Sequence, residues 1–294
     1  MKELFQEECL ICGGKNIHDL KKFEKHQLLK CSSCGFVFMK KIPSFEELKA
    51  YYSVYAYEYE KEISEATKMS IVDLLDSFEK YRVNNKMLDI GCGEGWILGL
   101  AKKRGWDVFG TEISQKAIEI CNRKGIKIYP GVLAPENVDE KNFDVIISSE
   151  TIEHINNPVK EVCGMNSLLR TGGLHYITTP NFNSYLRRFL GADYDIISYP
   201  EHLSYYTKST LNKLLSQSNF SKVKLLTTGI SITRYQSSKK NGNSVLPVHS
   251  NPDEKLRNRI TKSSSLLFIK RIVNSVLSLL GIGMTLKAYY IKRK

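Results

Sequence analysis

Four cysteines near the N-terminus stand in two pairs whose spacing suits one metal ion. Cys9-Leu-Ile-Cys12 and Cys31-Ser-Ser-Cys34 are separated by eighteen residues. Each CxxC pair places two thiolates on one tight turn, and two such turns complete the tetrahedral four-sulfur shell of a structural zinc site. We expect these cysteines to bind zinc in a small ribbon, with no coordination position left for catalysis. The alternative is four unrelated free thiols.

A glycine-rich turn between a predicted strand and a predicted helix suits a nucleotide. The apolar strand Lys86–Ile90 runs into Gly91-Cys-Gly-Glu-Gly95, and a helix is expected from about residue 97 to 104. Glycines let the backbone approach a ligand closely, and the N–H groups at a helix N-terminus face it. A second predicted strand, 107–110, leads to Glu112, whose carboxylate can accept hydrogen bonds from both ribose hydroxyls of an adenosine.

Two details favour S-adenosylmethionine over a dinucleotide. Trp96 stands where the GxGxxG fingerprint needs its last glycine, and Asp89 lies two residues before the turn. The segment Leu88-Asp-Ile-Gly-Cys-Gly-Glu-Gly95 resembles the first motif of class I methyltransferases. The resemblance implies that Asp89 lies near the methionine part, that the glycines pass under the cofactor, and that Glu112 holds the ribose. A sugar- or flavin-nucleotide site is the alternative. The expected cofactor-binding residues are Asp89, Gly91, Cys92, Gly93, Gly95, Glu112, Ile113 and Glu150.

Two histidines that follow predicted strands are the natural general bases for methyl transfer. His154 ends the segment Ser149-Glu-Thr-Ile-Glu-His154, and His202 ends Tyr199-Pro-Glu-His202. Methyl transfer is an in-line displacement on a sulfonium, so the enzyme must orient the acceptor, remove its proton and exclude water. An unperturbed histidine titrates near neutrality. The expected catalytic residues are His202, His154, Tyr199 and Glu153.

The segment 149–154 is similar to the ExxEH segment of ubiquinone-pathway and small-RNA 2′-O-methyltransferases. In those enzymes, acids and histidines hold a divalent cation beside vicinal hydroxyls. The resemblance implies a divalent-cation site at Glu150, Glu153, His154 and His202. Such a cation would lower the pKa of the acceptor hydroxyl and orient its approach. The alternative is that Glu153 and His154 only brace the fold.

The segment Tyr199–His202 resembles bacterial deoxysugar methyltransferases that also carry an N-terminal zinc ribbon. In those enzymes the tyrosine or the histidine acts as the base. The sugar C-methyltransferases extend into a further C-terminal domain that this sequence does not show, so O-methylation is the expected reaction.

A parallel sheet is needed to bring these residues to one edge. Strands expected at 126–129, 143–149 and 174–179 alternate with helices. The alternation predicts an α/β fold: a Rossmann-like, seven-stranded, mostly parallel sheet with helices on both faces and the site at the carboxyl ends of the strands. The family resemblance covers about residues 85–220. It has one departure, Val132, which stands where relatives often carry an acid that reads the adenine amino group.

The chain divides into four expected domains. Ser44 and Glu47 fit a capping box that begins a helical region, a tyrosine-rich stretch follows as lid or pocket lining, and a second helix is expected at 68–80. The domains are the zinc ribbon (1–42), the helical cap (43–84), the S-adenosylmethionine-binding core (85–228) and a basic C-terminal segment (229–294).

Basic residues concentrate in the C-terminal segment. The net charge of the chain is +12, and residues 229–294 alone carry 13 Lys or Arg against two acids. We expect a loop over 236–259, a helix over 265–280, and a strand over 285–291 that pairs antiparallel at the far edge of the sheet. The helix either lies on an anionic membrane or packs on the core or on another subunit.

These features predict an S-adenosylmethionine-dependent methyltransferase that O-methylates a sugar hydroxyl in bacterial surface-glycan synthesis. The expected acceptor is a small molecule or a nucleotide- or lipid-linked glycan. The sequence shows neither a signal peptide nor a long uncharged apolar stretch, so we expect a cytoplasmic protein with peripheral contact at the inner face of the membrane. One alternative is an RNA methyltransferase, which the near-neutral charge before Gly229 disfavours. Another is a non-catalytic S-adenosylmethionine-binding scaffold.

Overall fold

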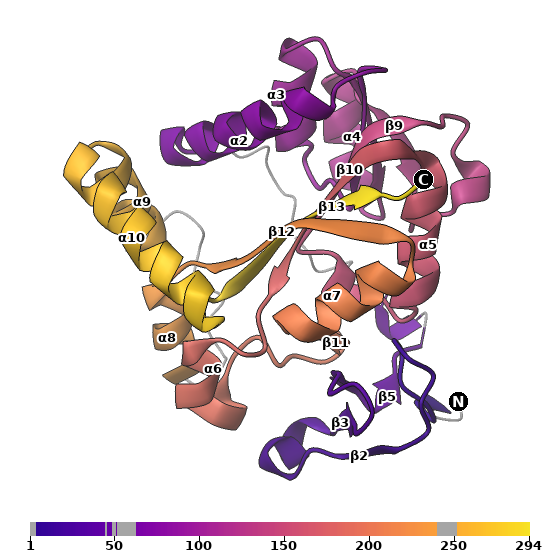
Figure 1. Ribbon diagram of the computed structural model, residues 1–294, viewed down its shortest axis with the longest axis vertical. Coiled ribbons are helices and arrows are strands. Elements are labelled where there is room, and N and C mark those ends of the chain that lie inside the picture. Colours follow the sequence, from indigo (N-terminus) through magenta and orange to yellow (C-terminus); the bar gives the residue numbers. More distant parts are fainter. Residues whose placement is uncertain (1–3, 45, 49–50, 52–62, 240–251) are drawn as a thin grey trace.

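The structure, a computed structural model, is built around one seven-stranded sheet (Figure 1). It describes residues 4–44, 46–48, 51, 63–239 and 252–294. All strands of the sheet run in one direction except β13, which confirms the expected Rossmann-like fold. In their order across the sheet, the strands are β12 (Phe220–Thr228), β13 (Thr285–Lys292), β10 (Leu169–Pro180), β9 (Phe143–Ser149), β6 (Lys86–Ile90), β7 (Asp107–Glu112) and β8 (Lys127–Pro130).

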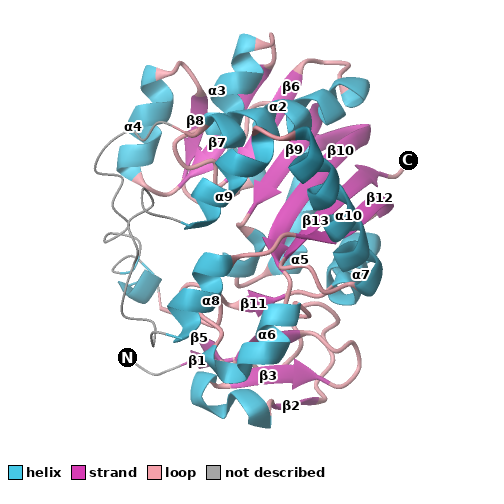
Figure 2. Ribbon diagram, turned by 90° about the vertical axis from the view of Figure 1, so that its left-hand side faces the viewer, coloured by secondary structure: helices cyan, strands magenta, loops and turns pink. Residues whose placement is uncertain are grey.

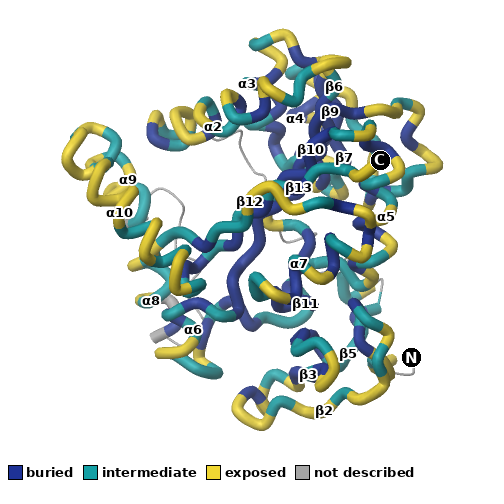
Figure 3. The backbone as a smooth tube through the Cα atoms, viewed as in Figure 1, coloured by how far each residue is buried: buried dark blue, intermediate teal, exposed yellow. Residues whose placement is uncertain are grey.

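Helices cover both faces of the sheet because the central strands bury side chains on both sides (Figures 2 and 3). In β9, Val145 and Ile147 join the core cluster beneath α2 and α3, whereas Ile146 joins the cluster beneath α5 and α7. This period-two alternation within a continuous apolar run is typical of a central parallel strand. One face carries α2 (Glu65–Phe78), α3 (Trp96–Lys103) and α4 (Gln115–Arg123); the other carries α5 (Pro158–Leu168) and α7 (Lys208–Gln217).

The N-terminal ribbon shares a sheet with the core. Its strands β2 (Ile17–Asp19), β3 (Leu28–Cys31) and β4 (Val37–Met39) pair antiparallel, and the core strand β11 (Ser204–Tyr205) continues the sheet beside β4. Phe36 is fully buried, with its ring 5.2 Å from that of Tyr206. The ribbon is therefore packed onto the core. It also contains η1 (Lys21–His26) and the pair β1 (Leu4–Phe5) and β5 (Lys41–Ile42).

The region after the ribbon begins with the expected capping box. Glu47 N donates to Ser44 Oγ at 3.1 Å, and Ser44 N donates to Glu47 Oε2 at 2.9 Å. The tyrosine-rich stretch beyond Tyr51 lies outside the described residues. The second expected helix is α2, which begins at Glu65 rather than 68 because Ser64 caps it by accepting from Thr67 N. The remaining short elements are η2 (Glu79–Tyr81), η3 (Pro135–Asn137), η4 (Ile152–His154), α6 (Tyr185–Leu190) and η5 (Gly191–Asp193).

Two expectations for the C-terminal segment are wrong. Strand β13 pairs antiparallel as expected, but it lies between β10 and β12, so the edge strand is β12. The expected loop over 236–259 is helical in its described part, with α8 (Ile232–Lys239) and α9 (Pro252–Thr261). Asp253 accepts hydrogen bonds from Ile232 N and Thr233 N and so caps α8 from a position twenty residues away along the chain.

The expected helix over 265–280 is α10 (Ser264–Leu280), which contacts β12 and α9. No single helix among the described residues has the length and apolar character to cross a membrane. The bent pair Asp253–Thr261 and Ser264–Leu280, with 119° between them, meets that test of length and composition together.

The turn that precedes β13 is predicted to require glycine at position 283. A Cβ on Gly283 would lie 2.5 Å from the backbone of Thr227 and Thr228, whereas a Cβ on Gly99 in α3 would meet nothing within 4 Å. We expect Gly283→Ala to lower the free energy of unfolding by about 2–4 kcal/mol, because backbone must move to admit the methyl group. Gly99→Ala, the matched control, should be neutral or raise it by up to about 1 kcal/mol. Urea unfolding measures both, and equal effects would contradict this packing.

Candidate active site

The turn after β6 requires glycine, both for its backbone angles and for the space around it. Gly91, Gly93 and Gly95 have φ angles of 69°, 53° and 70°, in the left-handed region that favours glycine. A Cβ on Gly95 would lie 2.8 Å from Ile126 Cδ1 and 2.9 Å from Cys121 Sγ. The three glycines place no side chain between the backbone and a ligand at the carboxyl end of β6.

Glu112, at the end of β7, is held against this turn by backbone donors. Its Oε2 accepts from Gly93 N at 2.8 Å, and its Oε1 accepts from Ile113 N and Ser114 N, both at 2.8 Å. All three donors are backbone N–H groups, so no other side chain is needed to fix the carboxylate. A carboxylate fixed in this way keeps lone pairs for the hydroxyls of a ribose.

The other expected cofactor residues lie around the same turn. Asp89 is buried in β6, and burial, followed by the nearby Cys121 and Glu112, raises the pKa of its carboxyl. The Cys92 side chain fills the space beside Gly110, where a Cβ would lie 2.7 Å from Cys92 Sγ. Ile113 is 53% exposed although it follows a buried strand.

Val132, the departure from the family pattern, is also an exposed apolar residue. It is 63% exposed, and Gly131 N before it donates to Glu112 O at 2.7 Å, which joins this loop to the end of β7. Ile113 and Val132 are thus exposed apolar side chains on two joined loops, and such a surface suits an aromatic base.

Glu153, His154 and His202 converge beyond the carboxyl ends of β9 and β10. Their ligand atoms all lie within 4.8 Å of one another, and the two imidazole centroids are 4.8 Å apart. Nδ1 of His154 lies 2.7 Å from Glu201 O, and Nδ1 of His202 lies 2.6 Å from Ile196 O. A carbonyl only accepts, so we infer that each Nδ1 carries the proton and that each Nε2 carries the lone pair of the neutral ring; His154 also interacts with the backbone of Glu150.

Burial keeps both imidazoles neutral. It lowers the pKa of His154, and it lowers the pKa of His202 to about 4, with His154 contributing further. At neutral pH both rings therefore present an unprotonated Nε2. A base with a pKa near 4 is weak, so by itself it accepts a hydroxyl proton poorly.

Glu153 completes the group with a buried carboxylate. Its Oε2 accepts from Thr179 Oγ1 at 2.9 Å, and its Oε1, 4.0 Å from His154 Nε2, has no hydrogen-bond partner among the described residues. Burial, followed by the charge of Glu150, raises the pKa of this carboxyl. Two imidazoles fixed through Nδ1 and one unpartnered carboxyl oxygen are a donor set that fits a divalent transition-metal ion such as Mn²⁺.

Two predicted site residues do not join this group. Glu150 is exposed with a φ of 52°, and its carboxylate is outside the cluster of ligand atoms. The Tyr199 hydroxyl donates to Glu47 Oε1 at 3.2 Å, and burial, followed by the charge of Glu47, raises its pKa. That contact and that pKa both oppose a role for Tyr199 as the general base.

A small cavity adjoins the histidine group and includes residues that the sequence did not single out. Asn181, Phe182 and Tyr194 line it together with Glu153 and His202. Asn181 directly follows β10, and its position as a polar residue at the carboxyl end of a parallel strand could have indicated from the sequence that it lines the site. Tyr194 comes from the segment between β10 and β11, whose path no local pattern indicates.

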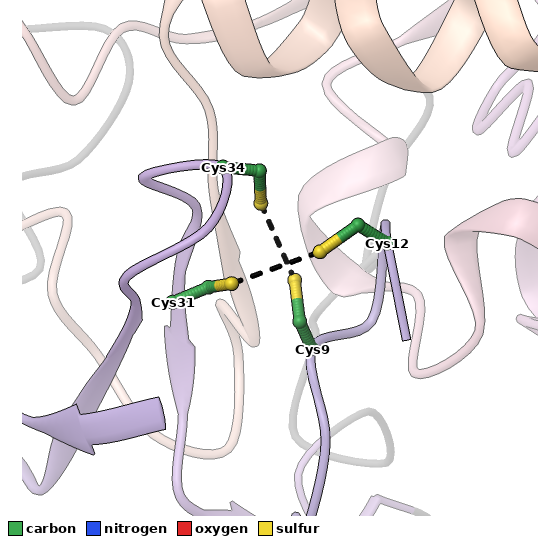
Figure 4. A group of neighbouring side chains, drawn as sticks. All are labelled: Cys9, Cys12, Cys31 and Cys34. Carbon is green, nitrogen blue, oxygen red and sulfur yellow. Dashed lines mark hydrogen bonds between the residues drawn. The ribbon is translucent and has the colours of Figure 1, made fainter. Parts of the chain in front are cut away.

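The four N-terminal cysteines converge on one point (Figure 4). The Sγ atoms of Cys9 and Cys34 lie 3.5 Å apart, and those of Cys12 and Cys31 lie 3.7 Å apart. Four sulfurs about 2.3 Å from a tetrahedral zinc ion would lie about 3.8 Å apart, so the spacing fits zinc. Burial raises the pKa of Cys31, but hydrogen bonds from backbone N–H groups and from the neighbouring thiols together lower it to about 7, which favours the thiolate, whereas burial raises the pKa of Cys9 and Cys34.

Backbone hydrogen bonds connect the ribbon to the histidine group. Met39 N, at the end of β4, donates to Leu203 O at 2.9 Å, and Leu203 N donates to Glu153 O at 2.8 Å. Leu203 directly follows His202. The ribbon therefore fixes the segment that carries His202 and joins it to Glu153.

Comparison with known proteins identifies one family, and relatives that align with this chain over part of their length. A family described as "Methyltransferase domain" matches residues 59–225. Ubiquinone biosynthesis O-methyltransferase of Pelagibacter ubique is 35% identical over 125 residues, or 40% of this chain and 52% of that protein. The protein of the same name from Roseobacter denitrificans is 30% identical over 150 residues, or 47% of this chain and 60% of that protein. The chain thus spans little more than half the length of these relatives.

A solved structure shares the fold. The SAM-dependent methyltransferase of Archaeoglobus fulgidus superposes with a TM-score of 0.51 at 19% identity, over 76% of this chain and 94% of that one.

The fixed carboxylate of Glu112 predicts a specific loss of ligand binding. We expect Glu112→Ala to weaken binding of S-adenosylhomocysteine by about tenfold to a hundredfold, because a charged hydrogen-bond acceptor is worth about 1.5–3 kcal/mol. Glu119→Ala removes an exposed carboxylate from the adjacent α4 and should leave the affinity unchanged. Isothermal titration measures both. Equal affinities for the two variants would show that Glu112 does not contact the ligand.

Proposed function

The chain belongs to the methyltransferase domain family, and from this premise we propose that it transfers the methyl group of S-adenosylmethionine to a hydroxyl of a small or glycan acceptor. The main observation that supports a hydroxyl as the acceptor is the cluster formed by Glu153, His154 and His202. The acceptor oxygen attacks the methyl carbon, the carbon–sulfur bond breaks, S-adenosylhomocysteine leaves, and the hydroxyl proton passes to solvent.

The cofactor is proposed to bind across the ends of β6 and β7. Glu112 accepts from the ribose hydroxyls, the bare turn Gly91–Gly95 passes beneath the cofactor, and Asp89 lies toward the methionine part. Ile113 and Val132 offer apolar surface to the adenine ring. These positions follow the first-motif resemblance residue by residue, and the hydrogen bonds of Glu112 support them.

A divalent cation is proposed at Glu153, His154 and His202. When bound, it would lower the pKa of the acceptor hydroxyl and fix the oxygen near the methyl group. The low pKa of His202 supports this, because a weak base needs an acidified hydroxyl while a neutral Nε2 remains available as a ligand. The unpartnered Oε1 of Glu153 supports it as well. Glu150 is left out of the proposed ligand set.

Zinc is proposed in the four-cysteine site, on the sulfur spacing given above. With four protein ligands it has no open position, so its role is structural.

The acceptor is proposed to be a sugar hydroxyl of a nucleotide- or lipid-linked glycan in bacterial surface-glycan synthesis. The ribbon together with the Tyr199–His202 segment supports this choice, through the resemblance to deoxysugar methyltransferases. The relatives named for ubiquinone biosynthesis also act as O-methyltransferases, which supports a hydroxyl acceptor in general.

Removal of one cation ligand should abolish metal binding and transfer while sparing the cofactor site. In zinc-loaded protein we expect one Mn²⁺ site by electron paramagnetic resonance, lost in His202→Ala and in Glu153→Gln. Transfer from tritiated S-adenosylmethionine to nucleotide sugars with vicinal hydroxyls should fall by about a hundredfold or more in both variants.

S-adenosylhomocysteine affinity should stay unchanged in both variants. His18→Ala, which removes an exposed histidine from the ribbon, is the matched control and should retain Mn²⁺ and activity. Full transfer activity in His202→Ala would contradict the proposal.

A further inference from the structure

Helix α10 packs against β12 through a side that is both polar and apolar, with Leu267, Val273, Asn274, Leu277 and Ser278 half-buried. Asn274 Oδ1 accepts from Gly229 N at 3.0 Å, and Ser278 Oγ accepts from Thr227 N at 3.3 Å, so both polar side chains bind the end of β12. None of its seventeen residues is buried. A helix that packs for hydrophobic burial would cover most of its apolar side chains, whereas α10 leaves seven of its ten apolar residues exposed.

The side of α10 that is turned away from β12 carries exposed apolar residues, and Figure 3 draws α10 in the exposed and intermediate colours. Its residues recur every three or four positions, which places them on one helix face. Leu279 is 87% exposed and Phe268 is 63% exposed. A continuous apolar strip of this kind on a protein surface marks an interaction site. We define the outer face of α10 as Phe268, Ile269, Ile272, Val276, Leu279 and Leu280.

Exposed basic residues lie on α9, on α10 and between the two helices, and we call them the basic border. The α9–α10 pair carries six exposed basic residues against Asp253 and Glu254, and Asp253 already caps α8. An apolar strip on a helix pair that also carries exposed lysine and arginine suits the boundary between lipid chains and anionic headgroups. The six are Lys255, Arg257, Arg259, Lys262, Lys270 and Arg271.

A second copy of the chain fits this face less well. A helix of seventeen residues is about 26 Å long. One helix face of that length buries much less than the roughly 800 Å² per partner of a stable interface. Pairing two such faces would also bring their basic borders together, and like charges repel.

We propose that the outer face of α10 docks on an anionic membrane surface, with the apolar side chains at the level of the lipid headgroups and the basic border on lipid phosphates. The helix end that docks is joined to the candidate active site. The Asn181 side-chain amide donates to Gly281 O at 3.1 Å and to Gly283 O at 2.7 Å, and Asn181 lines the cavity beside Glu153 and His202. Docking would therefore hold that cavity close to the membrane. This consequence rests on the proposed function, whereas the docking itself does not.

The test is vesicle flotation of the full zinc-loaded chain. Vesicles of phosphatidylcholine alone are compared with vesicles that also contain phosphatidylglycerol. We expect binding to the anionic vesicles only, weakened by salt. The double variant Phe268→Ser/Leu279→Ser should lower the partition coefficient by roughly tenfold or more, because two large apolar side chains no longer enter the interface. Arg271→Glu/Lys262→Glu should weaken binding to anionic vesicles as well.

Val83→Ser is the matched control, because Val83 is 67% exposed on a loop far along the chain from α10. It should bind vesicles as the unmodified chain does, and all variants should keep their affinity for S-adenosylhomocysteine, which shows that they fold. Failure of the unmodified chain to bind either vesicle would overturn the proposal. A dimer in light scattering that Phe268→Ser/Leu279→Ser converts to a monomer would also overturn it and assign the face to a second copy. Neither readout uses methyl transfer, so failure here is distinct from failure of the proposed function.

Discussion

The pairing of β4 with β11 is the constraint on which the arrangement of the active site depends. It attaches a ribbon with little core of its own to the chain immediately after His202. The next residue, Leu203, is bonded on one side to Met39 of the ribbon and on the other to Glu153. Metal binding by four cysteines supplies folding free energy to small ribbons. In this account, that free energy also holds the segment that carries one histidine against the segment that carries the other.

The two halves of the site are stabilised by different interactions. On the cofactor side, the backbone of two loops fixes Glu112, through Gly93 N in the glycine turn after β6 and through Ile113 N and Ser114 N after β7. On the acceptor side, side chains from distant segments meet in a buried setting that disfavours charge. A buried carboxyl with one unpartnered oxygen beside two neutral imidazoles is costly unless something binds that oxygen. The acceptor side is therefore the part that a ligand or a metal ion should stabilise most.

Much of this could be predicted from local sequence, and the failures share a cause. The strands around β6 to β10, the glycine turn, Glu112 and the capping box of Ser44 are encoded within a few residues, so periodicity and turn chemistry identify them. The position of β13 inside the sheet, the cap that Asp253 gives to α8, and the contact of Tyr199 with Glu47 join residues far apart in the chain. No local pattern encodes those contacts. The shared sheet of ribbon and core was missed for the same reason, because β11 has only two residues.

The most direct test of the central claim is ¹⁵N nuclear magnetic resonance of His154 and His202, as a function of pH, in zinc-loaded and zinc-free protein. With zinc, we expect both rings to be neutral and protonated on Nδ1 at about pH 7.5, and His202 to titrate near pH 4. Removal of zinc should release the β11 segment and move the pKa of His202 toward the ordinary histidine value of about 6.5. An unchanged pKa and tautomer of His202 in the zinc-free protein would contradict the claim that the ribbon positions this residue.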